Sequence, residues 1–387
     1  MKYVLVIYEG AAQGPCDDLE GATPLELARN IHATALKARG QAGLLRWPER
    51  DAVTRTEQAL AWLLGVAPEE ARALRRGPLE AAGTAMDRSR WTYAYRGNFI
   101  TTDGPEIRDN RVHGLSRDET AWLTQAVQEA TQEEPVLFEV LGPGRVAVMF
   151  DRLDGVIDDG AFPRLGELEE PETAARSSAR SRVMAAAQSA LARQSINDVR
   201  VDLGENPANC LWLWGGGPPV RLGRPFLGAP LRACMITNSP LARGLATLCG
   251  MSTEPLGDPW AEAAKPELIT AEEIAARIAA HELTVIYVEA PNEGGTFDAP
   301  VDCVKSLDRL DIHVLARVVE AVERAGPVRL MVTALPAEGE FLGQTPVLLW
   351  GAGISGDEAA RWDETHCGEG ALGVTPAQRC LSRLIGE

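Results

Sequence analysis

The sequence lacks several features that would assign a function directly. Its seven cysteines include no CxxC pair, which argues against a zinc knuckle and against a dithiol redox motif. No apolar run approaches the roughly 20 residues that a membrane-spanning helix needs. No basic segment precedes an apolar run near the start of the chain, so we expect no signal peptide. These absences predict a cytoplasmic protein with reduced thiols.

Positive charge is also scarce. The 38 Lys and Arg residues are outnumbered by 55 Asp and Glu residues, which gives a formal net charge of -17. Nucleic acid and anionic membranes both require a basic surface, so we expect the protein to bind neither. A local arginine pocket for a small anion is compatible with this charge. The length of 387 residues suits two or three domains, or one large core with an insertion.

Common catalytic motifs are missing as well. Gly215–Gly217 is followed by Pro218, and the Gly-Lys-Ser/Thr ending of a phosphate-binding loop is absent, so we interpret it as a tight turn. The sequence contains no Gly-x-Ser-x-Gly elbow and no visible Ser-His-Asp arrangement. Of its five His residues, four lie on expected helices or in the middle of the chain, where a structural role is usual. His366, in an expected loop, is kept as a candidate site residue.

What is present begins with a buried strand. Tyr3–Tyr8 is a continuous apolar and aromatic run that ends at Glu9 and Gly10. Such a run predicts a strand covered on both faces, as in the centre of a parallel sheet. Active sites of these sheets gather at the carboxyl edge. We therefore expect Glu9 near any site, as a metal ligand or acid/base, or as a carboxylate that caps a helix or pairs with Arg.

The segment after this strand predicts a helix with a well-defined start. Thr23 suits the N-cap, Pro24 the first helical position and Glu26 the third position after the cap. We expect this helix to run to about Ala38 and to end at Gly40.

The rest of the chain changes character twice. Strands and helices alternate after residue 203, as at the buried strand Thr284–Ala290, and this repetition predicts an α/β fold with a doubly wound, mostly parallel sheet. Residues 71–202 have the pattern of an α+β module, with an alternating strand at Trp91–Thr101. We predict a discontinuous core of residues 1–70 and 203–387, with an inserted α+β domain of residues 71–202.

Eight stretches, spread over nearly the whole chain, match one known pattern in its order. They are Tyr3–Ala12, Thr23–Glu26, Leu63–Gly65, Gly77–Ala82, Tyr95–Asn98, Asn206–Gly217, Val288–Glu293 and Pro346–Ile354. Together they resemble the archaeal-type, cofactor-independent phosphoglycerate mutases of the alkaline phosphatase superfamily. The resemblance implies a phosphatase-like core, an inserted substrate-covering domain and an ancestry in glycolysis. A proposed homoserine kinase group is similar, so the resemblance does not fix the substrate.

The resemblance also implies a mechanism. Two divalent cations, manganese or zinc, would be held by carboxylates and imidazoles, while a Ser takes up the phosphoryl group and returns it. Carried onto this chain, the first-strand ligand falls on Glu9 and the nucleophile on Thr56. A Thr hydroxyl can replace that of Ser. Thr56 also has a plain structural interpretation, as the N-cap of the helix that follows it.

The other ligand positions carry side chains that suit a cation poorly. Where the family has Asp, His, Asp, His and His, this chain has Asn292, Thr296, Leu335, Pro336 and Glu340. Asn is a poor cation ligand, and Leu and Pro are not ligands at all. We therefore predict no metal cofactor and no mutase activity. The expected protein is a degenerate homologue, a pseudoenzyme with a binding or regulatory role and a protein partner that the sequence does not name.

Basic residues of the inserted domain are the candidate ligand-binding groups. Arg96, Arg145 and Arg200 match positions where the family places basic residues. A fork of guanidinium groups would hold a phosphate or carboxylate, and hence a small phosphorylated or anionic ligand. The alternative is salt bridging at the surface of an acidic protein.

A second function stays open. An active phosphoglycerate mutase or phosphotransferase would need a rebuilt site with Mn²⁺ or Zn²⁺, drawn from Glu9, Thr56, Glu293 and His366. Without two metals, the ~10²–10⁴ available from general acid–base catalysis would not replace the missing charge stabilisation. We therefore favour the degenerate homologue.

Overall fold

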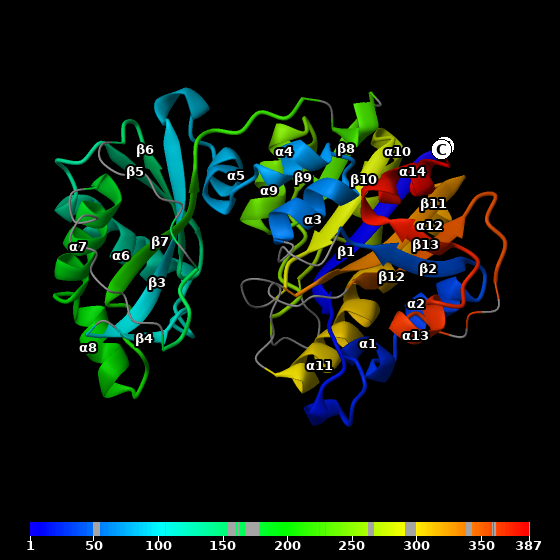
Figure 1. Cartoon of the computed structure of the whole chain (residues 1–387), viewed down its shortest axis with the longest axis horizontal. Helices are drawn as coiled ribbons and strands as arrows, with labels where there is room; N and C mark the ends of the chain where they lie inside the picture. Colours follow the sequence, from blue (N-terminus) through cyan, green and yellow to red (C-terminus); the bar gives the residue numbers. More distant parts are fainter. Residues whose placement is uncertain are drawn as a thin grey trace. The chain divides into compact units, whose positions relative to one another are not determined.

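The computed structural model describes residues 1–48, 55–104, 106–153, 160, 162–166, 178–223, 225–228, 230–261, 267–290, 299–337, 343–357, 359 and 361–386. The chain forms two compact units (Figure 1). Met1–Ala73 with Leu222–Glu387 makes the first unit, and Leu74–Arg221 makes the second. The boundary expected after residue 202 differs from the observed one, because strand β7 (Cys210–Gly217) pairs with strand β3 (Tyr93–Asp103) of the second unit.

The first unit is built on an eight-stranded sheet in the order β13-β2-β12-β11-β1-β10-β8-β9. The strands are β1 (Lys2–Ala12), β2 (Gln41–Arg46), β8 (Ala233–Ile236), β9 (Ser252–Glu254), β10 (Leu283–Val288), β11 (Val328–Pro336), β12 (Gln344–Gly351) and β13 (Gly373–Pro376). β1 pairs in parallel with β10 and β11, whereas β12 runs antiparallel to β11 and β2. The predicted α/β class and the central place of the first strand are confirmed.

Helices cover both faces of this sheet. They are α1 (Pro24–Leu27), α2 (Ile31–Lys37), α3 (Thr56–Leu63), α4 (Pro68–Arg72), α9 (Pro240–Leu248), α10 (Ala271–Ala280), α11 (Pro300–Leu310), α12 (Ala316–Arg324), α13 (Glu364–Cys367) and α14 (Cys380–Ile385). Val4, Val6 and Tyr8 of β1 share one core cluster with residues of α1, α2, α10, α11 and α12. Leu5, Ile7 and Glu9 point to the other face, because side chains alternate along a strand.

The second face is covered by α14 and α3. The Sγ atom of Cys380 in α14 lies 3.3 Å from the Sδ atom of Met331 in β11. Met331 pairs with Leu5, so α14 lies on the face to which Leu5 and Glu9 point. α3 packs against both α14 and β11. Glu9 therefore projects toward the side of the sheet that carries α3.

The helix expected over residues 24–38 is interrupted. Its start is as predicted, because Thr23 and Glu26 form a reciprocal capping box. Asn30 then takes a left-handed conformation, with a φ of 44°, and separates α1 from α2. The carboxylate of Asp311, in a π-helical turn (Asp311–Leu315), accepts the N–H groups of His32 at 2.8 Å and Ala33 at 3.0 Å. A distant side chain thus caps the new helix start.

The second unit is an antiparallel sheet between helices. Its strands are β3 (Tyr93–Asp103), β4 (Glu106–Asp109), β5 (Val136–Gly142), β6 (Arg145–Phe150) and β7, and its helices are α5 (Arg76–Ala82), α6 (Arg117–Ala130), α7 (Ala179–Leu191) and α8 (Ser195–Asp202). Ala81 of α5 packs with Ala94 and Ala147 on one face. Leu123 of α6 and Val183 of α7 belong to the core on the other face. In the described part of the chain, no helix is both long and apolar enough to cross a membrane.

A buried ion pair ties the chain together beside β2. The Nζ atom of Lys37 lies 3.1 Å from Oδ1 of Asp357, and their side chains are 4% and 6% exposed. The Oδ2 atom of Asp357 also accepts the N–H groups of Ala42 and Ala371, both at 2.8 Å. One carboxylate therefore holds the start of β2, the approach to β13 and a buried cation.

We expect Asp357→Ala to lower the free energy of unfolding by about 3–5 kcal/mol, because it leaves the Lys37 ammonium buried and unpaired. Urea unfolding measures this change. The control is Glu323→Ala, which removes an exposed partner of Arg39 and should cost less than about 1 kcal/mol. Equal effects of the two substitutions would contradict the assignment.

Candidate functional site

Glu9 lies at the carboxyl edge of the central strand, as the sequence predicts. Its side chain is 3% exposed, and its Oε2 atom accepts the N–H of Ala290 at 3.3 Å. Gly10 follows with a φ of 67°, a left-handed conformation that glycine adopts without strain. The carboxylate is thus turned toward the end of β10, where it holds the backbone.

The neighbour of Glu9 across the sheet is apolar. Tyr8 pairs with Ala334 and Ala12 with Pro336, and the register shifts between these pairs, so Leu335 lies opposite the irregular stretch of β1 that contains Glu9. Leu335 is 1% exposed, and Pro336 is paired with Ala12 at the end of β11. Neither side chain has a donor atom for a metal ion. The end of β11 therefore supplies only hydrocarbon side chains opposite this stretch of β1.

Thr56 is a buried helix-start residue but not an N-cap, and that structural prediction is wrong by one position. Arg55 has the extended backbone of an N-cap, and its carbonyl accepts the N–H groups of Gln58 and Ala59, both at 3.0 Å. Thr56 is the first residue of α3 and is 3% exposed. It therefore belongs to the helix on the face of the sheet to which Glu9 points.

His366 lies on the opposite face from Glu9. It belongs to α13, and its Nδ1 atom is 2.8 Å from Oδ2 of the fully buried Asp363. Trp362, one residue before Asp363, packs edge-on against Tyr8 at a centroid distance of 6.2 Å. Since Tyr8 and Glu9 point to opposite faces, the structure does not bring His366 and Glu9 together.

Around α13 the sequence forms a clasp of hydroxyl and carboxylate groups. Thr23 donates to Oε2 of Glu364 at 2.7 Å, and Thr365 donates to Oε1 of Glu26 at 2.6 Å. Burial raises the pKa of Glu364 to about 7, with a further upward push from the negative charges of Asp363 and Glu26. The bond from Thr23 opposes this rise but does not cancel it.

Four of the expected site positions fall outside the part of the chain that the structure describes. Asn292, Glu293, Thr296 and Glu340 lie outside the described residues. Within the part that the structure describes, no group of three or more His, Cys, Asp or Glu side chains is arranged to hold a metal ion.

In the second unit, Arg96 is part of a buried charge cluster. Arg96 is 0% exposed; its Nη1 atom pairs with Glu80, and its Nε atom donates to Oδ1 of Asn98 at 2.9 Å. The Nε atom of Arg76 reaches the same Glu80 oxygen at 3.1 Å. Burial lowers the pKa of Arg96 to about 10, and the charges of Arg145 and Arg76 add to this effect against the attraction of Glu80.

Two of the three predicted arginines are neighbours, and the third is apart. Arg145 stands opposite Asn98 in the β3–β6 pair and influences Arg96 electrostatically. Arg200 instead donates to the carbonyl oxygens of Asn206 at 2.8 Å and His113 at 2.6 Å. The chain segment at Asn206 meets β3 near Thr101, five residues or about 16 Å along the strand from Arg96.

The cluster therefore consists of Arg76, Glu80, Arg96 and Arg145. Sequence reasoning missed Arg76 and Glu80. Their i,i+4 spacing on a helix was the available signal, since residues with that spacing are neighbours on a helix surface. The burial of Arg96 also argues against the surface salt-bridge alternative for this residue.

The raised pKa of Glu364 predicts how the stability of the protein changes with pH. The Glu of an unfolded chain has a pKa near 4.3, so the folded protein keeps the proton of Glu364 to higher pH. The protonated Glu364 contributes fully to the free energy of unfolding below about pH 4, and this contribution is lost as the pH rises toward 7. We expect Glu364→Gln to be more stable than the wild type at pH 8, by about 4 kcal/mol at most, and nearly equal at pH 4. Urea unfolding across this range measures it.

The control for this experiment is Glu369→Gln, on an exposed residue of the same segment. This variant should keep the pH profile of the wild type. A Glu364→Gln profile parallel to that of the wild type would contradict the assigned shift.

Comparisons with known proteins agree with the fold and the sequence pattern. The family model described as 2,3-bisphosphoglycerate-independent phosphoglycerate mutase matches residues 38–197. A relative of Methanothermobacter thermautotrophicus, 2,3-bisphosphoglycerate-independent phosphoglycerate mutase 2, is 24% identical over 100% of this chain and 97% of its own. A probable mutase of the same kind from Geobacter sulfurreducens is 26% identical over 86% of this chain and 85% of its own.

Two solved structures share the fold. The PH0037 protein from Pyrococcus horikoshii matches with a TM-score of 0.71 and 18% identity, over 100% of this chain and 96% of its own. The cofactor-independent phosphoglycerate mutase from Thermoplasma acidophilum matches with a TM-score of 0.53 and 19% identity, over 100% and 99% of the two chains. Together with the full-length relatives, these matches confirm the resemblance found in the sequence, to the archaeal-type 2,3-bisphosphoglycerate-independent phosphoglycerate mutases.

Proposed function

We propose that this family member has no mutase activity and acts as a binding or regulatory protein for a small phosphorylated anion. The observation that supports the proposal is the apolar end of β11 opposite the stretch of β1 that contains Glu9, because Leu335 stands where the family pattern requires an Asp ligand. A two-metal mechanism depends on donors around both cations. With Leu335 and Pro336 at the end of β11, two of those donors are replaced by hydrocarbon.

The remaining groups fit a metal pair poorly. The carboxylate of Glu9 already accepts the N–H of Ala290. Binding a cation would require it to give up that bond or to use its second oxygen alone. Leu and Pro supply no oxygen or nitrogen ligand, and Asn292 and Thr296 are neutral. We therefore derive no reaction step through a metal at this position.

The alternative of a rebuilt active site gains nothing from the position of His366. This residue stands on the face of the sheet opposite to Glu9 and is bound to Asp363. A site that used Glu9, Thr56, Glu293 and His366 together would need His366 on the other face.

The proposed ligand site is the arginine cluster of the second unit. The guanidinium groups of Arg76 and Arg96 both contact the carboxylate of Glu80, and the charge of Arg145 acts on Arg96. The planar guanidinium suits the oxygens of phosphate and carboxylate, so a group of arginines favours a small anion as its ligand. Arg145 is half-buried, whereas Arg76 and Arg96 are buried, so Arg145 is the group placed to meet a ligand first.

The relatives supply the first ligand to test. Their names describe phosphoglycerate mutases, and phosphoglycerate carries both a phosphate and a carboxylate. Retained binding without turnover would suit a protein that senses or sequesters such a compound. We place this function in the cytoplasm, since none of the seven cysteines, all within the described residues, forms a disulfide.

We expect 3-phosphoglycerate to bind the pure protein in calorimetry and to be recovered unchanged. Arg145→Gln should weaken binding about tenfold or more, because it removes a charge-assisted hydrogen bond. The matched control is Arg108→Gln on β4, whose exposed side chain pairs with Asp103 and Glu106. Equal affinities of the two variants, or no binding by the wild type, would contradict the proposed site.

A further inference from the structure

Strand β5 forms an edge of the sheet in the second unit. It pairs with β6 on one side, and no other described strand pairs with its outer side. Residues 136–140 are all half-buried, whereas Leu141 and Gly142 are buried. The half-buried stretch Val-Leu-Phe-Glu-Val contains four apolar side chains and no Pro or Lys. Natural edge strands usually carry such protecting residues, because an open edge can pair with another chain.

The hydrogen bonds to β6 fix which backbone groups point outward. Asp151 donates to the carbonyl of Pro135 at 3.0 Å, so Pro135, Leu137 and Glu139 face β6. In an antiparallel pair the intervening residues point their N–H and C=O groups the other way. Val136, Phe138 and Val140 therefore present these groups to the outer edge.

Two of the six outward groups already have partners. The N–H of Val136 donates to the carbonyl of Glu134 at 2.8 Å, and the carbonyl of Val140 accepts from Nη2 of Arg117 at 3.2 Å. Four groups are left without a partner among the described residues: the carbonyl of Val136, both groups of Phe138 and the N–H of Val140.

We propose that β5 pairs with β5 of a second copy of this chain, in an antiparallel arrangement with its two-fold axis at Phe138. In that register each Phe138 N–H donates to the carbonyl of Phe138 of the partner subunit. Each Val140 N–H donates to the carbonyl of Val136 of the partner subunit. The four open groups of each copy are thereby satisfied, and a closed two-fold interface results. The pairing joins the two five-stranded sheets into one.

The side chains are complementary in the same register. On one face Val136 meets Val140 of the partner subunit, and Phe138 meets Phe138 of the partner subunit, so apolar groups cover one another. On the other face Leu137 meets Glu139 of the partner subunit. Residues directly opposite in such a pair have Cβ atoms about 4.5–5.5 Å apart.

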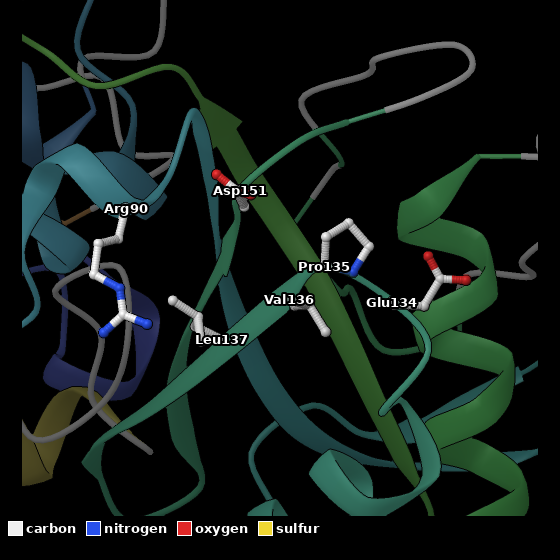
Figure 2. A pocket seen from close by; sticks show the side chains of 6 residues that line it. All are labelled: Arg90, Glu134, Pro135, Val136, Leu137 and Asp151. Atoms are coloured by element: carbon white, nitrogen blue, oxygen red, sulfur yellow. The ribbon is translucent and has the colours of Figure 1, made fainter.

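A pocket beside Leu137 provides a charge for that glutamate. It has a volume of about 420 Å³ and is lined by Arg90, Glu134, Pro135, Val136, Leu137 and Asp151. Figure 2 shows the Arg90 guanidinium next to Leu137, with Asp151 above them in the view. Glu134 is already bound by Arg182 at 2.6 and 2.9 Å. Arg90 is exposed and has no ion pair within the described residues, so it is available to Glu139 of the partner subunit.

Sedimentation equilibrium of the full-length protein tests the proposal. The wild type should be a dimer at tens of micromolar, and Phe138→Lys should be a monomer, because two like charges would meet at the two-fold axis. The control is Trp122→Lys, which changes another aromatic residue, 63% exposed on α6, and should leave the dimer intact. A monomeric wild type, or a dimer that persists in Phe138→Lys, would overturn the pairing. Circular dichroism checks that each variant is folded.

Exchanging the charges of Arg90 and Glu139 distinguishes loss of the interface from loss of the fold as the cause of a weaker dimer. Arg90→Glu and Glu139→Arg should each weaken the dimer about tenfold, since either one places like charges across the two symmetric contacts. The double variant should return to the affinity of the wild type. Additive weakening in the double variant would overturn the proposed register.

Discussion

The structure depends on the burial of the first strand at the centre of the sheet. Because β1 is covered on both faces, the first polar side chain at its carboxyl end, Glu9, is fixed in a low-dielectric position. A buried carboxylate needs hydrogen bonds or a cation. Here the N–H of Ala290 supplies a bond, and Leu335 of β11 lies opposite the irregular stretch of β1 that contains Glu9. These contacts support our proposal that Glu9 makes a structural contact at the end of β10 rather than binding a pair of divalent cations.

In the second unit the buried charges are positive, whereas Glu9 of the first unit is a buried carboxylate. Arg76 and Arg96 are removed from water, and one carboxylate, Glu80, contacts both of them. Burying two guanidinium groups against one partner is costly unless further acceptors contribute. Asn98 is one such acceptor, and the aromatic face of Trp214 near Arg76 is another source of stabilisation. A dianionic ligand that approached Arg145 would enter a region already positive, which makes ligand charge the main determinant of affinity there.

Local sequence patterns predicted the parts of the fold that depend on neighbouring residues. The strand at Tyr3–Tyr8 follows from its apolar run, and the start of α1 follows from the capping residues Thr23 and Glu26. The break at Asn30 could not be predicted, because it depends on Asp311, some 280 positions away. The role of Arg200 could not be predicted either. Its sequence position suggested that it binds a ligand, whereas in the structure its guanidinium donates to the backbone carbonyl groups of Asn206 and His113. That Leu335 lies opposite the stretch of β1 that contains Glu9 becomes visible only once the strand register is known.

The central claim, that the site at Glu9 holds no pair of catalytic metals, is tested most directly by calorimetric titration. The metal-stripped protein would be titrated with Mn²⁺ and then with Zn²⁺. We expect no binding at two sites even at millimolar metal, because Leu335 and Pro336 remove donors that two cations require. Tight binding of two ions per chain, lost in Glu9→Gln, would contradict this claim and would assign the residues around Glu9 to a rebuilt metal site.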